Sequence, residues 1–322
     1  MNKTGLSEIP IIKQVDHLII RVLNPNNLFN FLTNILQLPI SWDITSDGNV
    51  TSCGVFVGNI NFEIIQYKIP PKNIVSNAQF FGIAFLPHNF DRSLEELKTI
   101  NFPHGPPIPY YDSLLPYQTD TTQEDQKSQR IKRWTLSVLG GLLERSSKPF
   151  YLGRTFSGNS KFSNLIGKVL NLVGKFPIFA RFVQRKMGKS IFYITEYAHD
   201  IEKIYAERTL NFEEIKGGHL GIIKVKEIII MTNLFDEKKK QWNKLLASST
   251  SNEESVWQLN CGTSIRLLQG EEGKISSVLL QVKSLDQARS FLIENNILGA
   301  EKGDELIINK QIVDGLEIRI ST

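Results

Sequence analysis

Apolar positions along the chain recur in a fixed order of strand-like and helical stretches. The run from residue 15 to residue 22, Val-Asp-His-Leu-Ile-Ile-Arg-Val, is mostly apolar and ends before the turn Asn24-Pro25, which is typical of a strand. The next stretch has the spacing of a helix that covers a sheet, with apolar positions at Leu28, Phe31, Leu32, Ile35 and Leu36. Three short strand-like runs follow, around residues 40–44, 53–57 and 60–65. This segment therefore predicts the order β-α-β-β-β.

The same order recurs three more times along the chain. The later units open at residues 80–85, 225–230 and 277–282, and in each unit the first apolar run precedes a helical pattern. The second unit is interrupted by a long insertion. Four β-α-β-β-β modules are the simplest account of this self-similarity. The alternative is an α+β chain in which the starts of strands and helices resemble one another by chance.

Three stretches carry a resemblance to a known family: residues 15–20 with their helix, the closing run 58–65, and the run 275–282 with Ser-Leu-Asp-Gln-Ala at 284–288. They resemble the vicinal oxygen chelate superfamily, and most closely its glyoxalase-like proteins, of the glyoxalase, bleomycin resistance and extradiol dioxygenase type. The likeness covers most of the chain outside residues 113–190. It implies an α+β fold of tandem βαβββ modules, paired into two curved mixed sheets, with a helical insertion in the second module.

The length of 322 residues favours two domains. The resemblance implies an N-terminal glyoxalase-like domain at residues 1–216 and a C-terminal one at residues 217–322. Their modules are expected at residues 14–68 and 78–200, with the insertion at about 113–190, and then at residues 222–270 and 274–321. His219 precedes the third module and is interpreted as part of the linker between the domains.

In that superfamily, metal ligands come from the first and the last strand of each module, which implies His17 and Glu63 in the first module. An imidazole with a carboxylate suits Fe2+, Mn2+, Zn2+ or Ni2+. In the second module the first-strand position is Gly82, which has no side chain to offer. The last strand offers Glu196, although alignment of its terminal tyrosine with that of the first module puts Tyr193 opposite Glu63.

The resemblance thus implies a three-ligand metal site of His17, Glu63 and Glu196, in which Glu196 is the third ligand or a general base. The alternative is a hydrogen-bonded histidine at a strand end, beside a carboxylate that lies in the cleft or on the surface. The other histidines of the N-terminal half lie in loop-like contexts that favour solvation, and one of them as a substitute second ligand is a further alternative: His88, His104 and His199.

The C-terminal half offers a poorer donor set. Its equivalent positions are expected at Glu227, Arg266, Ser277 and Glu317. An arginine in place of a ligand repels a cation and pairs with a carboxylate instead. We interpret this half as a structural partner, with a cleft for an anionic ligand as the alternative.

The insertion contains a seven-residue sequence repeat within residues 164–177. The repeat places Lys168 and Lys175 on one side of a helix, beside an apolar stripe. Three interpretations stand: a lid over the first cleft, peripheral membrane contact through residues 161–189, and a helix packed on the protein's own sheet with solvated lysines. The first is our hypothesis, because the insertion interrupts the module that completes the cleft.

Composition narrows the class of protein further. The chain has 37 Lys and Arg against 33 Asp and Glu, and seven of the 37 lie in residues 161–189, which leaves 30 basic residues elsewhere. The basic excess is local, which argues against nucleic-acid binding. The two cysteines, Cys53 and Cys261, form no disulfide framework or zinc motif. With no signal-peptide pattern and no long apolar run, we expect a cytoplasmic protein, either monomeric or oligomeric.

The resemblance and the site residues together lead to one functional hypothesis and one rival. The hypothesis is a divalent-metal-dependent lyase, isomerase or dioxygenase that acts on a small oxygenated, partly apolar compound in the N-terminal cleft, with no organic cofactor. The rival is a metal-free protein of the same fold that binds or sequesters a small molecule. Gly82 favours the rival, and His17 with Glu63 favours the enzyme.

Overall fold

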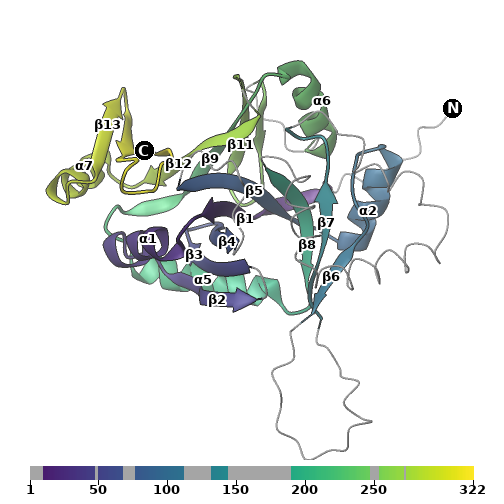
Figure 1. Ribbon diagram of the computed structural model, residues 1–322, viewed down its shortest axis with the longest axis horizontal. Helices are drawn as coiled ribbons and strands as arrows, with labels where there is room; N and C mark the ends of the chain where they lie inside the picture. The colour runs from purple at the N-terminus through teal and green to yellow at the C-terminus, as the bar shows by residue number, and fades with distance from the viewer. Residues whose placement is uncertain are drawn as a thin grey trace, which may run out of the picture.

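The structure is a computed structural model that describes residues 10–47, 50–67, 77–111, 132–143, 190–246, 254–271 and 273–322. Its strands form two curled mixed sheets, one of eight strands and one of seven (Figure 1). The predicted α+β fold with curved mixed sheets is confirmed. Most of the predicted insertion, including the basic stretch at 161–189, lies outside the described residues.

The eight-stranded sheet is built from the first two modules. The first contributes β1 (Ile12–Val22), α1 (Pro25–Asn30) with a π-helical turn (Phe31–Ile35), β2 (Ile40–Asp47), β3 (Val50–Phe56) and β4 (Asn61–Tyr67). The second contributes β5 (Ala78–Pro87), α2 (Phe90–Thr99), β6 (Ile108–Tyr111), β7 (Lys132–Leu139) and β8 (Ile191–Tyr197). The strand order is β2-β3-β4-β1-β5-β8-β7-β6. The two opening strands, β1 and β5, therefore lie antiparallel at the centre, and each pairs in parallel with the last strand of its own module.

Local sequence starts the helices that follow these central strands. The Asn24 side chain caps α1 by accepting a hydrogen bond from the backbone N–H of Asn26, and Pro25 occupies the first turn. The Asn89 side chain caps α2 in the same way, through the backbone N–H of Arg92 at 2.9 Å. Both helices thus begin directly after the strand that each must cover.

The seven-stranded sheet has the order β10-β11-β9-β12-β15-β14-β13. Its elements are β9 (Ile222–Thr232), α6 (Phe235–Leu245), β10 (Val256–Gln258), β11 (Ser264–Gln269), β12 (Lys274–Val282), α7 (Leu285–Glu294), β13 (Leu298–Lys302), β14 (Glu305–Ile308) and β15 (Ile318–Ser321). Within the described part of the third module only three strands occur, β9, β10 and β11, one fewer than the predicted β-α-β-β-β order. The chain between α6 and β10 includes residues 247–253, which lie outside the described part.

Strand register makes the two sheets equivalent residue by residue. His17 pairs with Ala84 across the centre of the first sheet, and Ile19 pairs with Gly82. In the second sheet Glu227 pairs with Leu279, and Ile229 pairs with Ser277. His17, Gly82, Glu227 and Ser277 therefore occupy equivalent positions, as the comparison of the modules predicted.

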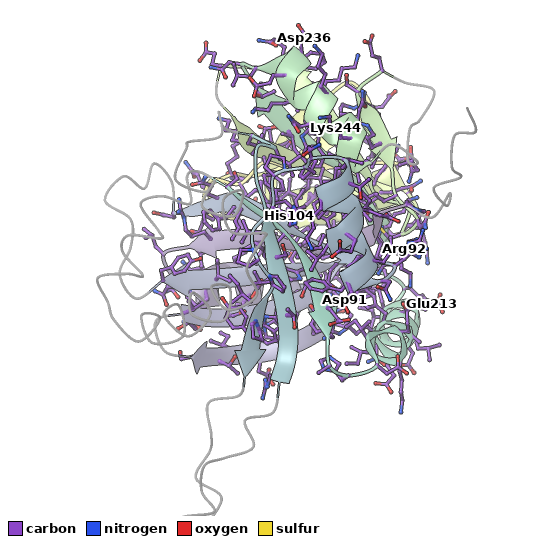
Figure 2. The ribbon with its side chains drawn as sticks, turned by 90° about the vertical axis from the view of Figure 1, so that its right-hand side faces the viewer. Asp91, Arg92, His104, Glu213, Asp236 and Lys244 are labelled. Atoms are coloured by element: carbon purple, nitrogen blue, oxygen red, sulfur yellow. The ribbon has the colours of Figure 1, made fainter. Side chains whose placement is uncertain are left out.

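The helices lie on the outer side of the first sheet. Figure 1 shows α1 and α2 outside the curl, and Figure 2 shows α2, with Asp91 and Arg92, in front of the strands. The main hydrophobic core includes Leu28 and Leu32 of the first helical segment and Leu97 of α2. A second, smaller cluster on the opposite side of the sheet is centred on Ile19, Ile65 and Phe81. We call the side of the sheet that carries this cluster the inner face.

A helix that the sequence pattern did not reveal, α5 (Ile201–Glu214), leads from the first sheet to the second. The loop between β3 and β4 joins the two halves through Asn59, whose side chain bonds Val225, Cys261 and Thr263. His219 lies in the turns after α5, and its Nδ1 is 2.9 Å from the carbonyl oxygen of Ile35. Among the described residues, no helix has the length and apolar character needed to cross a membrane.

Candidate functional site

A bulge in β1 brings the side chains of Asp16 and His17 together. In a regular strand, consecutive side chains point to opposite faces of the sheet. The pairing of β1 with β5 shifts between Val15 and His17, which leaves Asp16 as an extra residue without a partner in the register. As a result Oδ2 of Asp16 lies 2.7 Å from Nδ1 of His17. Both residues are buried.

Two tyrosines complete the surroundings of Asp16. The hydroxyl of Tyr197, at the end of β8, donates to Oδ2 at 2.5 Å. The hydroxyl of Tyr205, on α5, lies 2.8 Å from Oδ1 and 2.6 Å from the backbone oxygen of Asp16. Burial raises the pKa of Asp16, but the hydrogen bond and charge of His17 and the bonds from both tyrosines outweigh burial, so the pKa lies below its ordinary value. Asp16 is therefore a buried carboxylate that is held ionised.

The other ring nitrogen of His17 faces Glu63 and Tyr193. Nε2 lies 3.0 Å from Oε2 of Glu63 and 2.8 Å from the hydroxyl of Tyr193. Ala84 stands between His17 and Tyr193 in the strand register, and its small side chain leaves room for the phenol to reach the imidazole. Three polar groups from β1, β4 and β8 thus meet on the inner face.

Glu63 is oriented by its neighbours on β2 and β3. Its Oε1 accepts a hydrogen bond from Ser52 at 2.9 Å, and the Ser52 oxygen accepts one from the indole N–H of Trp42 at 3.1 Å. The Glu63 side chain is 20% exposed, against 8% for His17. Glu63 is consequently the most accessible charged group of the cluster.

The charge state of His17 follows from these contacts. Burial lowers its pKa, but the charges and hydrogen bonds of Glu63 and Asp16 raise it to about 10. At neutral pH the ring is therefore an imidazolium, with Nδ1–H donating to Asp16 and Nε2–H directed at Glu63. Burial and the charge of Glu63 raise the pKa of Tyr193 well above its ordinary value, so this phenol stays protonated.

The rest of the inner face is largely apolar. The side chains of Ile19, Ile65 and Phe81 are buried there, and the ring of Phe81 also contacts the guanidinium of Arg21, 4.7 Å from the ring centroid. A polar centre set in apolar surroundings is the usual arrangement of a small-molecule site, because a few convergent polar groups orient a ligand whose body is apolar.

Comparison with known proteins gives a fold but no family assignment. No protein-family model and no curated protein sequence matches the chain. Among solved structures, a hypothetical protein from Staphylococcus aureus is similar with a TM-score of 0.52 and 11% identity, over 95% of this chain and 98% of that one. An extradiol ring-cleaving dioxygenase from B. fuscum is similar with a TM-score of 0.54 and 10% identity, over 99% and 74%.

A third similar structure is homoprotocatechuate 2,3-dioxygenase from Brevibacterium fuscum in complex with 3,4-dihydroxyphenylacetate, with a TM-score of 0.54 and 10% identity, over 99% and 82%. The chain has a vicinal-oxygen-chelate-like fold. At these identities the similarity shows the fold alone. Because one fold can host many reactions, the reaction has to be argued from the residues of the site.

Of the three predicted metal ligands, the structure brings two together. His17 and Glu63 meet on the inner face, but Glu196 is exposed and lies on the opposite side of β8 from Tyr193. The register puts Tyr193 opposite Ala84 of β5, the place that corresponds to Glu63. Tyr193 therefore occupies the last-strand position, and the three-ligand set with Glu196 is not assembled.

The donor set of the candidate site falls short of a catalytic metal centre with three protein ligands. Its four positions hold His17, Glu63, Gly82 and Tyr193, of which only two supply the imidazole and carboxylate donors that a divalent ion prefers. Within the described residues, no group of three or more His, Cys, Asp or Glu side chains is placed to hold a metal ion. His88, His104 and His199 thus provide no substitute ligand there.

The corresponding positions of the second sheet differ in chemistry. Glu227 accepts a hydrogen bond from Arg266 at 2.9 Å, the pairing that the sequence indicated. The register puts Arg319, not Glu317, at the position equivalent to Tyr193, because Arg319 pairs with Leu279 as Tyr193 pairs with Ala84. The expectation of Glu317 at that position was wrong. Glu317 lies two residues before Arg319, and residues two apart in a strand point to the same face of the sheet.

Sequence reasoning missed the residues that hold His17 in place. Asp16 was visible beside His17, but strand alternation assigns it to the other face unless a bulge is known. Tyr205 lies on α5, 188 positions after His17, and no local pattern links the two. Tyr193 was the exception, since alignment of the closing strands had already put it opposite Glu63.

Proposed function

We propose that this chain is an enzyme that moves a proton next to a carbonyl group of a small, partly apolar compound bound on the inner face of the first sheet. One observation carries the proposal. Nε2 of His17 lies within hydrogen-bond distance of both Glu63 and Tyr193, while its other ring nitrogen is held by the buried carboxylate of Asp16. An accessible carboxylate beside two donors is the arrangement that acid–base chemistry requires.

Each group has a defined role in the proposed step. The carboxylate of Glu63 accepts the proton from the carbon beside the carbonyl. As that C–H bond breaks, its electron pair shifts to the carbonyl oxygen, which becomes an enolate. Nε2–H of His17 and the hydroxyl of Tyr193 donate hydrogen bonds to this oxygen. In an α-hydroxy carbonyl compound the neighbouring hydroxyl then passes its proton to the enolate oxygen, and return of the first proton from Glu63 to the former carbonyl carbon completes the isomerisation.

The surrounding network supports this role by orienting the two charged groups. Asp16 fixes the imidazolium ring through Nδ1 at 2.7 Å, and Ser52 fixes the carboxylate of Glu63 at 2.9 Å. Groups held in place before the substrate arrives need no rearrangement during the reaction, which is the main source of electrostatic stabilisation in enzymes.

The experiment is a deuterium-exchange measurement by NMR on the full-length protein, with a panel of small α-hydroxyketones and α-hydroxyaldehydes in D₂O. We expect the protein to catalyse exchange of the C–H beside the carbonyl for at least one compound, and Glu63→Gln to abolish it. Glu213→Gln, which removes an exposed carboxylate on α5, is the matched control and should leave the rate unchanged. Ligand binding without any exchange would favour a metal-free binding protein instead.

A second candidate function is the metal-dependent chemistry that the family resemblance implies. It is favoured by the carboxylate of Asp16 on Nδ1 of His17, since metal-bound histidines usually donate their other N–H to a carboxylate. In this version His17 and Glu63 would hold the ion, and the ion would supply a Lewis acid for the substrate oxygen. Elemental analysis of the protein and of His17→Ala, after incubation with Fe2+, Mn2+, Zn2+ and Ni2+, separates the two: bound metal that depends on His17 supports this candidate, and equal background in both proteins contradicts it.

A further inference from the structure

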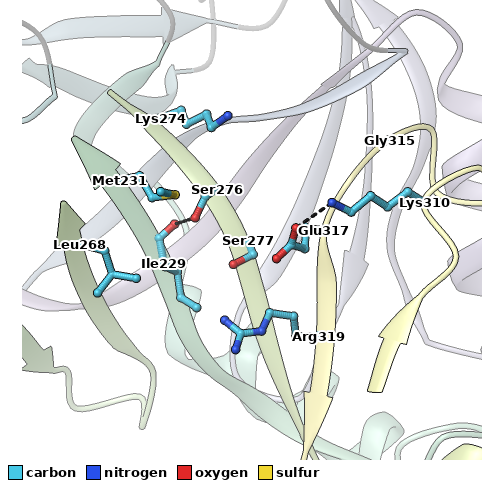
Figure 3. A pocket seen from close by; sticks show the side chains of 10 residues that line it. All are labelled: Ile229, Met231, Leu268, Lys274, Ser276, Ser277, Lys310, Gly315, Glu317 and Arg319. Atoms are coloured by element: carbon cyan, nitrogen blue, oxygen red, sulfur yellow. Dashed lines mark hydrogen bonds and ion pairs between the residues drawn. The ribbon is translucent and has the colours of Figure 1, made fainter. Parts of the chain in front are cut away.

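A groove of about 370 Å³ lies on the second sheet, at the place that corresponds to the His17 site of the first (Figure 3). Its volume falls at the small end of the range for small-molecule sites. Two of its lining residues occupy positions equivalent to the first site: Ser277 corresponds to Gly82, and Arg319 corresponds to Tyr193. The lining residues are Ile229, Met231, Leu268, Lys274, Ser276, Ser277, Lys310, Gly315, Glu317 and Arg319.

The hydroxyl of Ser277 is the first sign of a ligand. Ser277 is only 2% exposed, yet within the described part of the chain its side chain has no hydrogen-bond partner. Its neighbour Ser276 differs, because that hydroxyl donates to the backbone oxygen of Ile229 at 3.1 Å. Because Ser277 lines the groove, its hydroxyl is placed to donate a hydrogen bond to a ligand there. An acceptor atom of a ligand in the groove would supply the missing partner.

Arg319 is the second sign. Its guanidinium reaches into the groove from β15, close to Ser277 and Ile229 (Figure 3). Both Nε, at 2.6 Å, and Nη2 contact Oε2 of Glu305, which fixes the plane of the group, and among the described residues Nη1 has no partner. A guanidinium held in this way matches a carboxylate in geometry and charge.

The other residues that line the groove indicate the chemistry of the rest of the ligand. Lys310, at one side of the groove, is paired with Glu317 at 2.7 Å, and Lys274 lies at the other end. Met231 and Leu268 contribute apolar surface, and Leu268 is 39% exposed although it is a large hydrophobic residue. Cationic groups around an apolar wall favour a ligand with an anionic head and an apolar body.

We propose that this groove binds a small organic carboxylate with an apolar body. The carboxylate accepts hydrogen bonds from the Ser277 hydroxyl and the Arg319 guanidinium, and the apolar part lies against Met231 and Leu268. The site shares no residue with the His17 cluster, so its test is independent of the proposed enzymatic function.

The test is calorimetric titration of the full-length protein with benzoate, hexanoate and 4-phenylbutyrate, each beside its neutral amide. We expect at least one carboxylate to bind, and its amide to bind at least about tenfold more weakly, because the amide lacks the charge that Arg319 recognises. Arg319→Gln should weaken carboxylate binding by about tenfold. Ser277→Ala should weaken it several-fold without lowering the melting temperature, because the hydroxyl has no partner among the described residues of the free protein.

The matched control is Arg289→Gln. Arg289 on α7 is also ion-paired, with Asp286 and Glu301, but it does not line the groove, so its removal should leave the dissociation constant unchanged. Equal binding of acid and amide, or equal effects of Arg319→Gln and Arg289→Gln, would overturn the proposal. So would the absence of binding by all three carboxylates, or tighter binding of phenyl phosphate than of any carboxylate. If Arg319→Gln fails to fold, the effect of Ser277→Ala on carboxylate binding decides, and unchanged binding in that variant would overturn the proposal.

Discussion

A Cβ atom on Gly82 would lie 2.1 Å from the carbonyl oxygen of Ile191, in the neighbouring strand β8. Gly82 occupies the position equivalent to His17, so the second module cannot offer a matching ligand without moving its backbone. The site therefore has a histidine in the first module and none in the second, because β5 and β8 lie too close together at Gly82 to leave room for a side chain. Any chemistry at the site depends on His17, Glu63 and Tyr193.

The first prediction follows from that contact. Gly82→Ala should lower the free energy of unfolding by about 2–4 kcal/mol, because the added methyl forces the two strands apart. Urea denaturation measures the change. Gly105→Ala is the control, since the nearest atom to its added methyl would be 3.8 Å away, and it should change stability by less than about 0.5 kcal/mol. Equal stability of the two variants would contradict the explanation.

The second prediction concerns the buried pair in β1. Asp16→Asn keeps the size of the side chain but removes the negative charge that faces Nδ1 of His17 at 2.7 Å. Because the imidazolium then loses one of its two carboxylate partners inside the protein, we expect a loss of about 3 kcal/mol in the free energy of unfolding. The titration of His17, followed by NMR, should move to lower pH in the same variant. An unshifted titration would show that Glu63 alone holds the imidazolium.

The alternation of apolar and polar residues predicts much of the fold. His17 and Ile19 share a face of β1, and Glu63 pairs with Ile19 in β4, so the meeting of His17 and Glu63 follows from strand parity once the parallel pairing is assumed. The same reasoning assigned Tyr193 correctly to the last strand of the second module. These inferences depend on local periodicity, which a single sequence contains.

The rest of the site depends on features that periodicity does not encode. Asp16 reaches His17 only because β1 carries a bulge, which shifts the phase of alternation at one residue. Glu196 lies away from His17 and Glu63 for the complementary reason: it is one residue out of phase with Tyr193 and Tyr197. Tyr205 reaches Asp16 from α5 through packing between distant parts of the chain, and no spacing along the sequence signals that contact.

The third prediction is a pH dependence of stability. The pKa of His17 is raised to about 10 in the folded protein, against about 6.5 in the unfolded chain. Between these values the folded state keeps a proton that the unfolded state has released, so stability falls as pH rises. The contribution is fully present below about pH 6.5 and is lost as the pH passes through about 10.

Urea denaturation of the wild type and of His17→Gln between pH 6 and pH 10 tests this sign. The wild type should lose more stability than the variant over that interval, because the variant has no titrating ring at this position. Parallel curves for the two proteins would mean that His17 is neutral in the folded state.

The fourth prediction concerns Asn59, which joins the two halves of the molecule. Its side-chain N–H groups lie 2.8 Å from the hydroxyl of Thr263 and 3.0 Å from the backbone oxygen of Cys261, and its oxygen accepts a hydrogen bond from the backbone N–H of Val225 at 2.9 Å. Asn59→Ala removes these bonds from partly buried groups, although the Thr263 hydroxyl keeps its bond to the Val225 oxygen, so we expect a loss of about 2–3 kcal/mol. Asn295→Ala is the control, because Asn295 is exposed and, as far as the described residues go, its side chain bonds only the Phe291 oxygen within its own helix turn. If Asn59 couples the two sheets, its variant should also broaden the unfolding transition or split it in two, which scanning calorimetry would detect; a single sharp transition at an unchanged temperature would contradict the coupling.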